Sequence, residues 1–99
     1  MTSDQRLFAE MEKAVRSYDA GRITFRALLD RLESCADNLS DDDLPWKEAF
    51  QRQWGRMEDA YAYASFKGQK TIFESSMPAV EFALSEVRRL IAEKTRKPV

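Results

Sequence analysis

The densest group of side chains that could do chemistry is a set of seven carboxylates between residues 30 and 48. They are Asp30, Glu33, Asp37, Asp41, Asp42, Asp43 and Glu48. Only Arg31 and Lys47 oppose them, so this stretch carries a net charge of −5 in a chain whose total is −1. Carboxylates act in proton transfer when burial raises the pKa, and none of these seven lies within an apolar stripe. We therefore expect a charged contact surface rather than a catalytic centre.

Other signs of enzymatic chemistry are missing from the 99 residues. The chain has no histidine, which is the commonest general base and metal ligand. Cys35, the only cysteine, lies between Leu32 and Leu39 on an apolar sector, and this position predicts a buried small hydrophobe rather than a nucleophile. The glycines at positions 21, 55 and 68 are too far apart for a phosphate-binding loop. We expect no enzyme, no cofactor and no metal site.

Three of the acids have the spacing of neighbours on a helix. Asp30, Glu33 and Asp37 follow the pattern i, i+3, i+7, which places them on one exposed ridge that leads into the triplet of aspartates. One interpretation is a solvated face, with aspartates that cap the next helix. The other is a contact surface for a cationic partner, kept although negative charge is unfavourable near a helix C-terminus. The sequence leaves both open.

The acidic ridge must be positioned by helices, because apolar residues recur with helical periodicity along the whole chain. The pattern predicts helices over 4–19, 24–38, 45–67 and 76–94, followed by a short basic tail at 95–99. The third helix carries both tryptophans, in an apolar stripe formed by Trp46, Phe50, Trp54, Met57, Tyr61 and Ala64. Short links and the absence of a strand pattern predict an all-α, antiparallel four-helix bundle that forms a single domain over 1–99.

A second set of residues does not fit the predicted core. Gly55 lies in the middle of the third helix, opposite the tryptophan stripe, where a glycine is unfavourable and indicates that a neighbour approaches closely. Tyr63, Phe66 and Phe82 also lie off the buried sectors of their helices. These four residues form a possible second interface. The alternative is that the link at 68–76 folds over the aromatic rings.

The C-terminal end of the chain is basic, through Arg88, Arg89, Lys94, Arg96 and Lys97. Cations are favourable at the end of a helix, and this explanation is preferred to a nucleic-acid contact. There is neither a run of 18 apolar residues nor a basic leader followed by an apolar segment. We therefore expect no membrane partner and a cytoplasmic location. A single cysteine, which cannot form an internal disulfide, agrees with a reducing compartment.

Two longer patterns resemble a known class of proteins. They are G-x-I-T-F-x-x-L-L over 21–29 and W-x-x-x-F-x-x-x-W-x-x-x-E-x-x-Y over 46–61. In these patterns, in size and in its acidic helical surface, the chain resembles the small all-helical immunity proteins that protect bacteria from colicin-like, contact-dependent or other polymorphic toxins. The resemblance covers about residues 12–92. It implies an inhibitor that occludes the active site of a cognate toxin, often a cationic nuclease.

The sequence thus predicts a protein that binds and neutralises a basic protein toxin through the acidic surface. An alternative is a structural or regulatory subunit that self-associates through the aromatic residues of the third and fourth helices. A third possibility, for which the sequence gives less support, is a small nucleic-acid-binding protein that uses the basic C-terminus. As an inhibitor, the chain is expected to be a monomer or a weakly associating homodimer.

Overall fold

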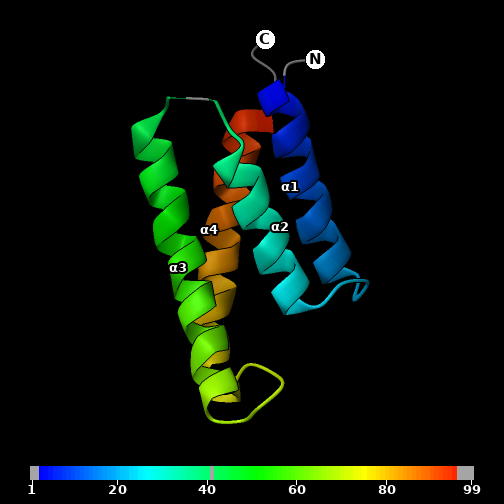
Figure 1. Cartoon of the computed structure of the whole chain (residues 1–99), viewed down its shortest axis with the longest axis vertical. Helices are drawn as coiled ribbons and strands as arrows, with labels where there is room; N and C mark the ends of the chain where they lie inside the picture. The colour runs from blue at the N-terminus through cyan, green and yellow to red at the C-terminus, as the bar shows by residue number, and fades with distance from the viewer. Residues whose placement is uncertain (1–2, 41, 96–99) are drawn as a thin grey trace.

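The structure is a computed structural model that describes residues 3–40 and 42–95. These residues form four α-helices. They are α1 (Ser3–Asp19), α2 (Phe25–Asp37), α3 (Leu44–Phe66) and α4 (Met77–Thr95), with a 3₁₀ turn η1 (Glu74–Ser76) directly before α4. Each predicted helix is confirmed to within one residue at either end. Successive helices run antiparallel, and the described residues contain no strand, so the predicted all-α four-helix bundle is confirmed (Figure 1).

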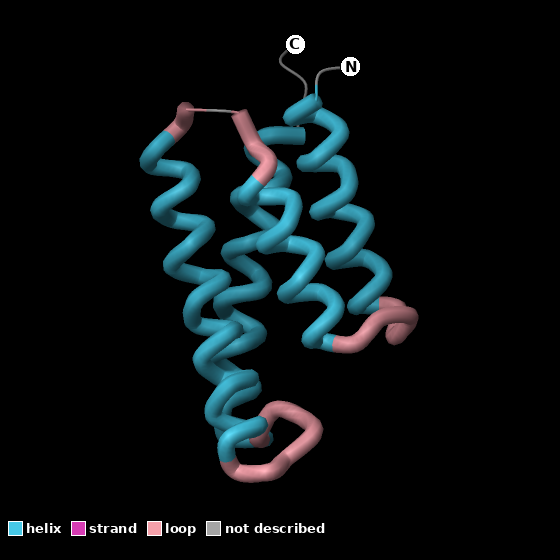
Figure 2. Tube along the Cα trace, in the orientation of Figure 1, coloured by secondary structure: helices cyan, strands magenta, loops and turns pink. Residues whose placement is uncertain are grey.

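The bundle is stepped at one end. Helix α1 packs against α2 and α4, while α3 packs against α4 and, less extensively, against α2. Figures 1 and 2 show that α3 and α4 extend past the turn that joins α1 to α2. The molecule is therefore elongated, with principal extents of 45 × 27 × 22 Å. The part of the α3–α4 hairpin beyond the α1–α2 turn therefore has fewer helix neighbours than the rest of the bundle.

Local signals explain where the helices begin and end. The side chains of Thr24 and Asp43 each accept a hydrogen bond of 3.1 Å from the backbone N–H three residues later, which caps α2 and α3. Gly21 and Gly68 have φ angles of 73° and 77°, in the left-handed region where glycine alone is unstrained. These two glycines let the chain reverse after α1 and after α3, and so they make the antiparallel arrangement possible.

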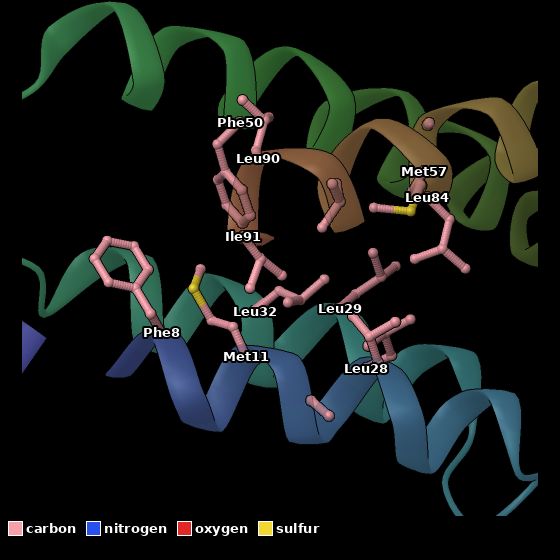
Figure 3. Packing of buried hydrophobic residues seen from close by; sticks show 14 of the residues in the cluster. Phe8, Met11, Leu28, Leu29, Leu32, Phe50, Met57, Leu84, Leu90 and Ile91 are labelled. Carbon is pink, nitrogen blue, oxygen red and sulfur yellow. The ribbon is translucent and has the colours of Figure 1, made fainter. Parts of the chain in front are cut away.

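Apolar side chains from all four helices meet along the axis of the bundle, as Figure 3 shows. The largest that are fully buried are Phe50, Met11, Leu28, Leu29, Leu32, Met57, Ile91 and Val87. Trp46, which is 5% exposed, stacks on Phe50 and meets the edge of Phe8. Its indole N–H donates to the carbonyl of Leu90 at 2.8 Å, which joins the start of α3 to the end of α4.

The predicted tryptophan stripe is wrong in one respect. Trp54 and Tyr61 are only half-buried, whereas Gln53 is 8% exposed and turns inward. The reason is that α3 packs more extensively on α4 than on α2, so its buried face is rotated toward α4. Trp54 lies at the α2 edge of that face, and its indole N–H donates to the carbonyl of Leu29 at 3.0 Å. Cys35, predicted to be buried, is also only half-buried.

Replacing Gly55 with alanine is expected to raise the free energy of unfolding by about 0.4–1 kcal/mol. Beyond its own turns of helix, a Cβ at Gly55 would meet no atom of the described residues within 4 Å, so these residues do not supply the close neighbour expected from the sequence. Urea denaturation of the parent and of Gly55→Ala measures the effect. Gly68→Ala is the matched control, and it should destabilise because the φ of Gly68 is positive. A loss of stability in Gly55→Ala would contradict the open helix face.

Candidate functional site

The acidic ridge of α2 lies along the boundary between α2 and α3. Arg26 occupies the same face of α2 as Asp30, Glu33 and Asp37, because it precedes Asp30 by four residues. Its Nη1 donates to both carboxylate oxygens of Glu58 on α3, at 3.0 and 3.3 Å. This face of α2 therefore borders α3. We call Asp30, Glu33, Asp37 and Glu58 the acidic seam.

Arg26, near the N-terminal end of α2, is a cation held in place beside the acidic seam. Its Nε donates to Asp30 Oδ1 at 3.0 Å, and its guanidinium lies 5.0 Å from the centre of the Tyr61 ring. The hydrogen bond to Asp30, followed by the charge of Glu58, raises the pKa of Arg26 above its ordinary value. Two carboxylates thus compensate one guanidinium, which ties α2 to α3 and commits part of the seam to the fold.

Glu33 and Asp37 are available for a partner. Both side chains are exposed, and neither forms an ion pair with any residue that the structure describes. Asp37 lines a hollow of about 270 Å³, together with Lys47 and Gln51 of α3. Counting Arg26 and Lys47 against the four carboxylates leaves the seam with a net charge of −2. Unpaired carboxylates on a solvent-exposed boundary can attract a cationic surface.

The remaining predicted acids are not part of the acidic seam. Asp42 is exposed in the connection between α2 and α3, whereas Asp41 lies outside the described residues. Asp43 caps α3 and accepts a bond of 2.8 Å from Lys94 Nζ, so its carboxylate serves the fold. Glu48 is exposed on the face of α3 opposite Trp46. Glu58 was not among the site residues predicted from the sequence, because no local pattern relates it to Arg26, which is 32 residues away in sequence.

The aromatic residues of the possible second interface are exposed, which decides between the two alternatives that the sequence left open. The exposed fractions of Tyr63, Phe66 and Phe82 are 52%, 84% and 56%. We call these three residues the aromatic surface. The link at 68–76 folds back far enough to place the Phe73 ring 5.3 Å from that of Tyr63, but it covers none of the three. Lys67 lies over the rings of Tyr63 and Phe66.

The basic cluster is largely neutralised within the fold. Arg88 pairs with Asp19 of α1, Arg89 pairs with two carboxylates of its own helix, and Lys94 pairs with Asp43. The rest of the cluster, Arg96 and Lys97, lies outside the described residues. A phosphate backbone would have to compete with these internal carboxylates, so the geometry gives little support to nucleic-acid binding.

The described residues also offer little for catalysis or metal binding. Burial raises the pKa of the Cys35 thiol, which keeps it protonated at neutral pH and weakens it as a nucleophile. In residues 3–40 and 42–95, no three side chains of the metal-ligating types converge on one point. Within the same residues, no helix is both long and apolar enough to cross a bilayer.

Comparisons with protein-family models, with curated proteins and with solved structures gave no match. The resemblance to bacterial immunity proteins therefore stays a prediction from the sequence patterns. Three surface features of the molecule bear on function: the acidic seam, the aromatic surface and the neutralised basic end.

Acidification should destabilise the fold partly through Asp43. Hydrogen bonds from Lys94 and from the backbone of Trp46 lower the pKa of Asp43 below its ordinary value. A carboxyl whose pKa is lower in the folded state stabilises the fold above its unfolded pKa of about 3.9, and that contribution is lost as the pH falls through the folded pKa. The melting temperature of Asp43→Asn should therefore fall less between pH 5 and pH 2 than that of the parent. Parallel pH profiles would contradict this assignment.

Proposed function

We propose that the protein binds and neutralises a basic protein toxin through the acidic seam, as an immunity protein does. The observation that carries this proposal is that Glu33 and Asp37 are exposed on one helix face and form no ion pair with any described residue. Such carboxylates contribute little to folding but attract a positively charged partner over about a Debye length. Asp42, five residues after Asp37, is exposed in the connection between α2 and α3 and adds a further negative charge.

Charge alone does not supply a stable complex, because electrostatic complementarity governs encounter and selectivity more than affinity. The acidic seam has an aromatic side chain beside it: Trp54 of α3 is half-buried and bonded to the backbone of α2 at Leu29. Large, rigid aromatic residues at the centre of a charged rim are typical of interface hot spots. We therefore propose that Trp54 provides the apolar contact and that the carboxylates direct the partner onto it. We also propose a cytoplasmic site of action, because a chain with a single cysteine cannot form an internal disulfide and suits a reducing compartment.

The test is a growth assay combined with capture. Proteins retained by the immobilised chain from a lysate of the source cell are identified, and each is expressed alone and together with the chain in a bacterial host. The proposal expects a basic protein that arrests growth alone and is tolerated when the chain is present. The variant Glu33→Gln, Asp37→Asn, Asp42→Asn should protect poorly.

The matched control changes the net charge equally at exposed acids outside the seam: Glu10→Gln, Asp59→Asn, Glu74→Gln. This control should protect as well as the parent. If no retained protein is toxic, the proposed toxin inhibition is contradicted. If the two triple variants protect equally, the acidic seam is not the inhibitory surface.

The aromatic surface supports a second candidate function, a subunit that self-associates. Phe66 is 84% exposed, and an apolar ring left in water is unfavourable unless a partner covers it. Light scattering over a range of concentrations distinguishes the two functions. A mass that rises with concentration in the parent, but not in Phe66→Ser, would favour the subunit, whereas a constant monomer mass would favour the inhibitor.

A further inference from the structure

A groove of about 520 Å³ lies at the step of the bundle, where the turn between α1 and α2 meets the segment that joins α3 to α4. Figure 1 shows the two connections at this end, one above the other. The residues that line the groove come from five separate parts of the chain. They are Tyr18, Thr24, Phe25, Arg26, Tyr61, Lys70, Thr71, Ile72 and Met77. Its volume is in the usual range for binding pockets, about 300–1,000 Å³.

The groove has an apolar floor. The Tyr18 and Phe25 rings are 5.7 Å apart, and the Phe25 and Tyr61 rings are 6.4 Å apart, so three aromatic rings form a continuous row. Ile72 and Met77 also line the groove, and all five side chains are half-buried. Half-buried rings leave apolar area in contact with water, and covering that area would be favourable. The floor therefore fits a large apolar side chain.

The rim of the groove carries one positive charge that no carboxylate of the described residues pairs with, that of Lys70. None of the lining residues is acidic, and two are cations. Arg26 is compensated by Asp30 and Glu58, but Lys70 is exposed and forms no ion pair within the described part of the chain. The N-terminus of α2, with its positive dipole end, opens onto the same rim beside Thr24. Lys70 and this helix end are therefore the groups of the rim that can attract a carboxylate.

We propose that this groove binds a segment of a partner protein in which a bulky apolar side chain is followed by a carboxylate. The apolar side chain covers the aromatic row, and the carboxylate pairs with Lys70. A protein segment fits better than an enclosed small molecule because Thr24, Lys70 and Thr71 are all exposed along the rim, which leaves the groove open for a chain to enter and leave. The inference does not rest on the proposed function: the groove shares Arg26 with the acidic seam, but the proposed contacts are the aromatic row and Lys70 rather than Glu33 and Asp37.

Two synthetic peptides test the proposal. Acetyl-Gly-Ser-Gly-Phe-Asp-Asp-Gly-Ser-Gly-amide and its counterpart with Lys-Lys after the phenylalanine are titrated into the ¹⁵N-labelled chain, and amide chemical shifts are recorded. The acidic peptide should bind saturably, with shift changes concentrated at the residues that line the groove. Lys70→Glu should weaken it at least 5-fold, whereas the control Lys67→Glu, a nearby lysine that does not line the groove, should leave its affinity within 2-fold. The triple variant Glu33→Gln, Asp37→Asn, Asp42→Asn should bind it like the parent.

Several results would overturn the proposal. They are the absence of saturable shifts with the acidic peptide, equal binding of the lysine peptide, or equal binding by Lys70→Glu. Shift changes centred on the aromatic surface would assign the peptide to that surface instead. Light scattering on the parent and on Lys70→Glu covers the remaining occupant: self-association that Lys70→Glu abolishes would assign the groove to a second copy of this chain rather than to a different protein.

Discussion

Trp46→Ala is expected to lower the free energy of unfolding by about 3–5 kcal/mol, the usual cost of deleting a large aromatic side chain from a packed interior. Trp46 is almost fully buried, stacks on Phe50 at 5.4 Å and meets the edge of Phe8 at 5.3 Å. Alanine would leave a cavity where α1, α3 and α4 meet, and it would also remove the donor to the carbonyl of Leu90. Because domains of this size are stable by only about 5–15 kcal/mol, the variant should unfold at much lower urea concentration.

The matched control is Trp54→Ala. Trp54 is also a tryptophan of α3 with a bonded indole N–H, but it is half-buried, so water can fill part of the space it leaves. Its loss of stability should be smaller than that of Trp46→Ala in the same urea titration. Equal losses, or a larger loss for Trp54→Ala, would mean that the buried face of α3 is turned toward α2 rather than toward α4.

Reversing two charges of the acidic seam, Glu33→Lys with Asp37→Lys, should slow association with the basic partner by about 10- to 100-fold at low ionic strength. Steered protein pairs associate several orders of magnitude faster than uncharged ones, and that gain depends on complementary surface charge. The rate of the parent should fall steeply as salt is added, while that of the variant should change little. Stopped-flow measurements from 20 to 500 mM salt, with the toxin identified by the growth assay, provide the comparison.

The control for that experiment reverses Glu10 and Asp59, which are exposed on α1 and α3 and lie outside the acidic seam. It produces the same change in net charge, so any effect of total charge appears in both variants. If the two double variants slow association equally, the attraction arises from the whole molecule and the seam has no special role. An unchanged rate in both variants would remove electrostatic steering from the mechanism.

Much of the fold follows from the sequence because its signals are local. Thr24 and Asp43 each cap a helix within three residues, and Gly21 and Gly68 end helices through their own backbone conformation. The helical period of the apolar residues then requires the four helices to share a core. The positions of Tyr63, Phe66 and Phe82 off the buried faces of their helices were predictable for the same reason, whereas the sequence left open whether the link at 68–76 covers them.

Other features depend on how the helices pack and could not be predicted from local patterns. Three such features are hydrogen bonds between residues that are 25 to 51 positions apart in sequence. They join Arg26 to Glu58, Trp54 to Leu29, and Lys94 to Asp43. The groove at the step exists only because α3 and α4 extend beyond α1 and α2. The sequence by itself thus determined the helices and the residues that face outward, through short-range hydrogen bonding and periodicity. Only the tertiary structure decided which outward carboxylates remain unpaired, because that depends on the rotation of each helix against its neighbours.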